Sequence, residues 1–231
     1  MLYSSTCGTG EDLVLLHGWG FSGSIFDKFI EKYKDLYRIT TIDLPGHGNS
    51  KSLDSISSWS KEIAKITPKN SILIGWSLGG LIAIDIASRV KLRKIILVAS
   101  TPKFVQSEDW IYGINEKHFY DFHSSLSSSP QKTLKRFISL QVSSKDQYKY
   151  LEASIDNNKP SDQGLNEGLD YLLKYDFRNL IDQIADITKV YLGEKDTLVP
   201  SSIKSWYEKK GIQVAILPGG HIPFLDDNFE I

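Results

Sequence analysis

The chain has 231 residues, and its hydrophobic fraction of 41% and charged fraction of 24% are typical of one globular domain or of a core with an insertion. Its net charge of −1 provides no global field to attract nucleic acid or an anionic membrane surface. Cys7 is the only cysteine, which excludes an intrachain disulfide framework and a cysteine metal cluster. No stretch approaches the roughly 20 apolar residues of a membrane helix, and the first residues do not resemble a signal peptide. We therefore expect a protein of the reducing cytoplasm.

Short apolar runs alternate with helical patterns along much of the chain. The apolar runs predict buried strands at residues 13–16, 37–42, 71–74, 94–99, 188–193 and 213–217. Helical spacing predicts helices at residues 22–33, 55–66, 80–87 and 201–210, the last of them capped by a serine. Strands that are apolar throughout and alternate with helices indicate an α/β fold with a mostly parallel, doubly wound sheet that is covered on both faces.

This alternation stops at residues 100–102 and resumes only after about residue 178. The segment between them contains no convincing buried strand. It predicts an aromatic-rich helix, a serine-rich link at residues 124–129, and further helices at residues 131–142 and 145–155. We therefore expect a core made of residues 1–101 and 179–231, and a helical cap made of residues 102–178.

A Gly-Trp-Ser-Leu-Gly motif at residues 75–79 lies between a predicted strand and a predicted helix. A strand that turns into a helix within so few residues strains the backbone at Ser77 and lifts its hydroxyl above the sheet. The start of the following helix directs free N–H groups and a positive dipole end toward an anion that forms there. The pattern therefore predicts that Ser77 is a nucleophile rather than part of a structural turn.

A serine nucleophile needs a base to take its proton and an acid to orient that base. His221 follows the last predicted strand and is our candidate for the base. Asp196 follows the preceding strand and is our candidate for the acid, with Glu194 as its competitor. The chain order Ser77, Asp196, His221 is one of the known orders of such a triad. All three residues follow strands, so we expect them to meet at the carboxyl edge of the sheet.

An oxyanion hole needs two peptide N–H donors. One is expected from Leu78, which follows the nucleophile in the sequence. The other is expected from Trp19, because it lies in the glycine-rich turn after the first predicted strand. Trp76, next to the nucleophile, is either a wall of the pocket or a packing residue.

The other histidines have less specific interpretations. We expect His17 to brace its loop through side-chain hydrogen bonds, and we expect His47 to be a solvated turn residue. The spacing of His118 and His123 on one predicted helix does not align them for a metal, so we interpret both as surface residues. Asp43 is expected to anchor the loop that it begins. No metal site is predicted.

Six segments carry a family resemblance, at residues 13–20, 43–50, 75–81, 98–102, 136–141 and 193–200. Over nearly its whole length the chain resembles the α/β-hydrolase superfamily, whose fold is a doubly wound sheet with an inserted cap. Residues 136–141 and the pairing of Trp19 with Trp76 resemble more narrowly the pimeloyl-[acyl-carrier protein] methyl ester esterases of biotin synthesis. The resemblance implies that Ser77, Asp196 and His221 are catalytic. The substrate contacts that it implies are Trp19, Ser77, Leu78, Phe137, Ile138, Ser139, Leu140, Gln141 and His221.

The predicted cap is locally basic although the whole chain is not. Between Pro130 and Tyr150 there are five basic residues and one acidic residue, a net charge of 5 − 1 = +4. An acyl-carrier protein is an acidic partner, so we expect it to dock here; the alternative is an ordinary solvated face. The residues expected to contact the carrier are Lys132, Arg136, Lys145 and Lys149. Apolar cap residues together with Trp19 and Trp76 would form a slot for an acyl chain of medium length.

We therefore expect a monomeric serine esterase that removes the methyl group from a carrier-bound pimeloyl ester and needs no cofactor. The carrier and small esters are its expected partners, and neither nucleic acid nor a membrane is expected. Three alternatives remain from the sequence. One is a broad-specificity carboxylesterase, and another is a lyase of menaquinone synthesis on the same fold. The third is a non-catalytic ligand receptor, against which the intact triad argues.

Overall fold

The computed structural model describes residues 1–142, 144–157 and 159–231. Within these residues one sheet of seven strands has the order β1-β3-β2-β4-β5-β6-β7. All neighbouring strands pair in parallel except β1, which pairs antiparallel with β3. The strands are β1 (Ser4–Cys7), β2 (Glu11–Leu16), β3 (Tyr37–Ile42), β4 (Ile72–Trp76), β5 (Lys94–Val98), β6 (Thr188–Gly193) and β7 (Gln213–Leu217).

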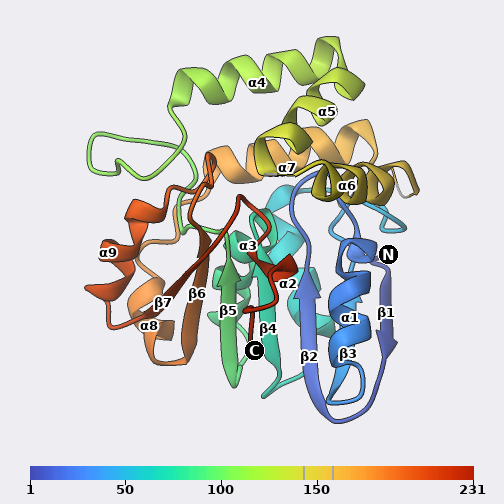
Figure 1. Cartoon of the computed structure of the whole chain (residues 1–231), viewed down its shortest axis with the longest axis vertical. Coiled ribbons are helices and arrows are strands. Elements are labelled where there is room, and N and C mark those ends of the chain that lie inside the picture. The colour runs from blue at the N-terminus through green and yellow to red at the C-terminus, as the bar shows by residue number, and fades with distance from the viewer. Residues whose placement is uncertain (143, 158) are drawn as a thin grey trace.

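Helices cover both faces of the sheet, which confirms the doubly wound arrangement (Figure 1). On one face, α2 (Trp59–Ile66), α3 (Leu78–Ala87), α8 (Ile181–Ile184) and α9 (Lys204–Glu208) pack into one hydrophobic cluster. On the other face, α1 (Asp27–Tyr33) and the C-terminal segment share a second cluster. Because both faces are covered, the central strands are apolar along nearly their whole length, as parallel strands in such sheets are.

Two local predictions about the core need correction. The edge strand β1 was not expected, because its four residues are polar and all are exposed, so no apolar run marks it. The expected serine cap at residues 201–210 is wrong. A 3-10 turn at Ser201–Ile203 begins after Pro200, and no side chain caps either this turn or α9.

Of the α-helices that the structure describes between β5 and β6, all except α8 cover the carboxyl edge of the strands (Figure 1). They are α4 (Glu116–Ser128), α5 (Pro130–Gln141), α6 (Lys145–Asn157) and α7 (Asp162–Lys174). The expected serine-rich link is instead the last part of α4. There Ser125 and Ser128 donate their hydroxyl groups to carbonyls one turn earlier, so the hydroxyls do not interrupt the helix.

The chain leaves and re-joins the core at one place. As it returns, the peptide N–H of Phe177 donates to the carbonyl of Pro102 at 2.9 Å. The two crossing segments, one that leaves β5 and one that follows α7, therefore lie side by side.

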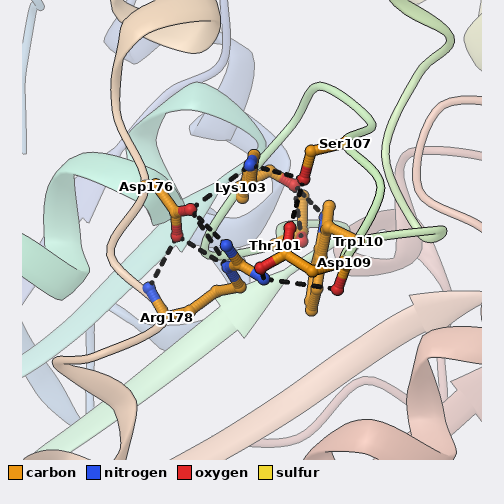
Figure 2. A network of polar contacts seen from close by, with 7 residues as sticks. All are labelled: Thr101, Lys103, Ser107, Asp109, Trp110, Asp176 and Arg178. Atoms are coloured by element: carbon orange, nitrogen blue, oxygen red, sulfur yellow. Dashed lines mark hydrogen bonds and ion pairs between the residues drawn. The ribbon is translucent and has the colours of Figure 1, made fainter.

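A polar network also joins these crossing segments (Figure 2). The Arg178 guanidinium donates to Asp176 at 2.7 Å and to Asp109 at 3.0 Å. Lys103 approaches Asp176 at 3.4 Å, and its carbonyl accepts the indole N–H of Trp110 at 2.8 Å. Arg178 also lies over the Trp110 ring, with the guanidinium carbon 5.3 Å from its centroid. One arginine thus links the outgoing and the returning segment.

No described helix combines the length and the hydropathy that a bilayer span requires. The described histidine, cysteine, aspartate and glutamate side chains form no group of three that could hold a metal ion.

Candidate active site

Ser77 occupies a strained turn between β4 and α3. Its φ of 54° and ψ of −118° lie outside the regions that non-glycine residues normally adopt. The turn brings α3 very close to β2, because a Cβ at Gly79 would lie 2.3 Å from the carbonyl oxygen of Leu16. Only glycine fits there. The sequence thus places the Ser77 hydroxyl at the carboxyl edge of the sheet, where only 4% of the residue surface is exposed.

His221 and Asp196 complete a buried chain of hydrogen bonds with Ser77. The imidazole Nε2 of His221 lies 2.8 Å from the Ser77 Oγ, and its Nδ1 lies 2.7 Å from Asp196 Oδ2. The other carboxylate oxygen of Asp196 accepts the peptide N–H groups of Leu198 and Val199 at 2.8 and 3.0 Å. Because that carboxylate is fixed on both oxygens, Nδ1 carries the proton toward Asp196. Nε2 is then free to accept the serine proton.

Two other carboxylates considered in the sequence lie away from the imidazole. Glu194 is exposed on the same loop as Asp196, and the structure brings Asp196 to His221 instead. Asp43 accepts the peptide N–H groups of Gly23 and Asn49 at 2.7 and 2.8 Å. This confirms that Asp43 anchors its loop.

The loop of His221 is held from two sides. The peptide N–H of His221 donates to the carbonyl of Gln141 at 2.9 Å, and its carbonyl accepts the indole N–H of Trp76 at 2.7 Å. Trp76 is fully buried, and its ring contacts Phe21 and Phe224. Of the two interpretations for Trp76, the structure supports packing, because this side chain does not line the cavity above Ser77.

Leu78 and the loop that contains Trp19, the expected oxyanion donors, are both next to Ser77. Leu78 is the first residue of α3, so its peptide N–H has no acceptor within the helix. The loop with Trp19 passes close to Ser77, since a Cβ at Gly18 would lie 3.3 Å from the Cβ of Ser77. The indole of Trp19 is fixed by donation to the carbonyl of Leu165 at 2.7 Å. The loop is thereby attached to α7 of the cap.

A cavity of about 470 Å³ opens above Ser77, between the sheet edge and the cap helices. This volume lies in the range of pockets that hold small organic ligands. Its apolar lining residues are Trp19, Phe104, Ile114, Phe119, Phe122, Phe137, Leu140, Leu169, Leu172 and Leu198. Its polar lining residues besides Ser77 are His118, Asp121, Ser125, Arg136 and Thr197.

Comparisons with known proteins agree with this geometry. Residues 13–231 match the model of the alpha/beta hydrolase family. The chain belongs to this family. The chain is 33% identical over 236 residues to a pimeloyl-[acyl-carrier protein] methyl ester esterase of Nitrosomonas europaea, with 97% of this chain and 94% of that protein covered. It is 36% identical over 224 residues to an esterase of the same name from Legionella pneumophila, strain Corby, with 94% and 90% covered.

Solved structures of an esterase and of a bromoperoxidase show the same fold at lower identity. An esterase from Exiguobacterium antarcticum superposes with a TM-score of 0.88 at 22% identity, covering 98% of this chain and 90% of that one. A bromoperoxidase from Bacillus anthracis superposes with a TM-score of 0.85 at 22% identity, covering 95% and 88%. At such identities the likeness concerns the fold alone.

In this hydrolase His17 braces its own loop, which also contains Trp19, as expected. Its Nδ1 lies 2.8 Å from the carbonyl of Gly18, and its Nε2 accepts the peptide N–H of Leu44 at 2.9 Å. Burial lowers the pKa of His17 to about 4, although the bond to Gly18 acts in the opposite direction. The side chain therefore stays neutral and can keep both bonds at neutral pH.

The expectation that His47 is a solvated turn residue is wrong. The residue is completely buried, with its ring 5.5 Å from that of His17 and 6.4 Å from that of Trp59. Burial, with a further contribution from His17, lowers the pKa of His47 to about 3. The start of α7 covers this turn, since the peptide N–H of Ser161 donates to the carbonyl of Gly46. A local sequence pattern does not reveal a covering element that is so distant in the chain.

Of the five consecutive residues of α5 expected to contact substrate, the structure brings two into the cavity. Phe137 and Leu140 line it. Ile138 is buried on the side of α5 that packs with α6, and Ser139 is exposed with its hydroxyl bonded back to its own helix. Gln141 contributes its carbonyl to His221 rather than to the cavity wall. A helix turns about 100° per residue, so five consecutive side chains cannot share one face.

The four basic residues expected to meet a carrier are all exposed. Arg136 is the one that lines the cavity above Ser77. Lys132 lies on α5 one turn before Arg136, and Lys145 and Lys149 lie on α6. The structure thus places one basic side chain at the cavity and three on neighbouring cap surfaces.

Sequence reasoning missed most of the cavity wall. The missed residues come from the segment before α4, from α4 itself, from α7 and from the loop after β6; they are Phe104, Ile114, His118, Phe119, Asp121, Phe122, Ser125, Leu169, Leu172, Thr197 and Leu198. Thr197 and Leu198 could have been found, because they directly follow Asp196. The others come together only through packing of the cap.

Proposed function

We propose that this protein hydrolyses the methyl ester of pimeloyl-[acyl-carrier protein] in biotin synthesis. The observation that carries the proposal is the buried hydrogen-bond chain Ser77–His221–Asp196 at the base of a largely apolar cavity. It occurs in a chain that aligns over nearly its full length with esterases of that name.

The proposed mechanism uses the triad twice. Ser77 Oγ attacks the ester carbonyl carbon while His221 Nε2 takes the hydroxyl proton, and Asp196 stabilises the imidazolium. The peptide N–H groups of Leu78 and Trp19 hold the oxyanion. The tetrahedral intermediate expels methoxide, which takes the proton from His221 and leaves as methanol. Water, deprotonated by His221, then attacks the acyl-enzyme and releases the carboxylate together with free Ser77.

The cavity supports a substrate with an apolar acyl chain. Phe137, Leu169 and Leu172 line the same cavity as Ser77, and hydrophobic burial would favour the methylene chain there. Arg136 at the cavity and the lysines on α5 and α6 carry the charge that an acidic carrier would meet. These steps require no metal or organic cofactor, and one chain contains every group that they use.

The test is the release of methanol from two substrates by the purified enzyme. One is methyl pimeloyl ester on its acyl-carrier protein, and the other is dimethyl pimelate in solution. We expect kcat/KM for the carrier-bound ester to exceed that for the free ester by at least about tenfold, which corresponds to roughly 1.4 kcal/mol of carrier contacts. Equal values would instead identify a broad-specificity carboxylesterase. Absence of methanol from both substrates would remove the esterase proposal.

A further inference from the structure

Helix α4 presents a polar row to the cavity that the reaction at Ser77 does not use. His118, Asp121 and Ser125 all line this cavity. Their spacing of three and four residues places them along one side of the helix. Phe122, on the same side, contacts Trp19 with 5.6 Å between the ring centroids, which shows that α4 reaches the oxyanion loop.

The polar side chains of this row have unused hydrogen-bonding capacity. Within the described part of the chain, the imidazole of His118 and the carboxylate of Asp121 make no hydrogen bond or ion pair. Ser125 donates its hydroxyl to the carbonyl of Asp121 at 2.7 Å, and its oxygen can still accept. The row therefore offers a carboxylate acceptor, an imidazole and a hydroxyl to a ligand.

The row lies on the solvent-exposed side of the cavity. His118 and Asp121 are exposed, whereas only 4% of the Ser77 surface is exposed. Helix α4 is also the cap helix farthest from the sheet in Figure 1, and Ser77 follows directly after β4. The rest of the cavity wall is mostly apolar, with Phe137, Leu169 and Leu172 among its residues. A ligand with its ester at Ser77 would thus place an apolar chain between these walls and polar groups beside α4.

We propose that the α4 row of His118, Asp121 and Ser125 binds the amide and hydroxyl groups of the pantetheine arm through which a carrier presents the acyl chain. This inference rests on the proposed function, because it identifies the part of the carrier-bound substrate that α4 would contact. An amide N–H or a hydroxyl would donate to Asp121, and His118 and Ser125 would pair with the carbonyls and hydroxyl of the arm. Arg136, which lines the same cavity from α5, remains available to the carrier protein.

The experiment compares a substrate that has the arm but no carrier protein with one that has neither. The first is the pantetheine thioester of monomethyl pimelate, and the second is dimethyl pimelate; methanol release is measured for both. The quantity of interest is the ratio of kcat/KM for the first substrate to kcat/KM for the second. The variants are His118→Ala, Asp121→Ala and their combination. Lys117→Ala is the matched control, because it is exposed on the same helix and does not line the cavity.

We expect the double variant to lower this ratio by about tenfold, which is the effect of losing one or two hydrogen bonds to the arm. Lys117→Ala should leave the ratio within about twofold of wild type. Asp121→Asn keeps an oxygen acceptor, so it should lower this ratio less than Asp121→Ala does. An unchanged ratio in the double variant would overturn the α4 subsite.

The same assay separates failure of the subsite from failure of the proposed function. A wild-type enzyme that hydrolyses the carrier-bound ester efficiently, combined with an unchanged ratio in the double variant, removes the subsite alone. A wild-type enzyme that gains nothing from either the arm or the carrier removes the proposed substrate and the subsite with it. Far-UV circular dichroism of each variant shows whether the protein has kept its helix content, which we expect because the two mutated residues are exposed.

Discussion

The carbonyl of Gln141 accepts the peptide N–H of His221 at 2.9 Å, so the last residue of α5 holds the loop of the proposed base. The carbonyl before it, of Leu140, accepts the hydroxyl of Thr197 at 3.2 Å. Thr197 directly follows Asp196. The end of one cap helix thus fixes the loops of His221 and Asp196, and the position of α5 is linked to the alignment of these two residues with Ser77.

Gly220→Ala tests this link. A Cβ at Gly220 would lie 2.4 Å from the Gln141 carbonyl oxygen, so either α5 or the loop before His221 would have to move. We expect kcat to fall by about tenfold or more, because small displacements of reacting groups are costly. Gly211→Ala is the control, since its Cβ would meet nothing within 4 Å and its positive φ should reduce stability alone. Equal kcat values for the two variants would contradict the link.

Ser77→Ala should abolish ester hydrolysis and leave the fold unchanged. The expected loss in kcat is on the order of 10⁴-fold or more, because the triad acts as a unit. Methanol release from dimethyl pimelate measures the loss, and the thermal unfolding midpoint serves as the control for folding. A variant that retained a tenth of the wild-type rate would exclude Ser77 as the nucleophile.

Asp196→Asn should reduce kcat by roughly 10⁴-fold, because an amide would no longer hold His221 in the tautomer that accepts the serine proton. Glu194→Gln, on the same loop but exposed, is the matched control and should have little effect. Steady-state kinetics of both variants with the same ester give the two kcat values to compare. The opposite ranking would assign the acid to Glu194.

Replacing Lys132, Arg136, Lys145 and Lys149 by glutamate should weaken turnover of the carrier-bound ester relative to the free ester. Exposed charges act over long range, so the relative loss should shrink between about 0.05 M and 0.5 M salt, where the Debye length falls from roughly 14 Å to 4 Å. The ratio of kcat/KM for the two substrates at each salt concentration measures the effect. An equal loss on both substrates would indicate damage to the cap rather than loss of a docking surface.

The free energy of unfolding should decrease as the pH falls below about 6.5. Burial lowers the pKa of His17 to about 4 and that of His47 to about 3, whereas both titrate near 6.5 in the unfolded chain. Between these values the unfolded state binds more protons, so acid favours unfolding. Urea midpoints at about pH 7.5 and pH 5 measure the decrease, and His47→Gln should make it smaller. Identical wild-type midpoints at the two pH values would contradict neutral burial of these histidines.

The sequence was sufficient for features that depend on local pattern. Apolar runs located the six parallel strands, most clearly the central ones, which are covered on both faces. The glycine-flanked Ser77 marked the turn after β4. The sequence was insufficient where a segment distant in the chain determines the environment of a residue. His47 has the local pattern of a solvated turn residue, but α7 covers it. Ile138 is expected from the sequence in the slot above Ser77, but in the structure it packs with α6. The polar side of α4 faces the cavity only because the cap folds back over the sheet edge.

The junction of Pro102 with Phe177, reinforced by Arg178, has a consequence for how this chain can vary. A hydrogen bond joins the two ends of the segment between Pro102 and Phe177. A segment of another length could therefore start and finish at the same two points. Closing a loop twice as long costs only about 0.6 kcal/mol more. The junction is thus a suitable site for exchanging the inserted helices between hydrolases, because another cap could replace this one while β5 and β6 keep their register.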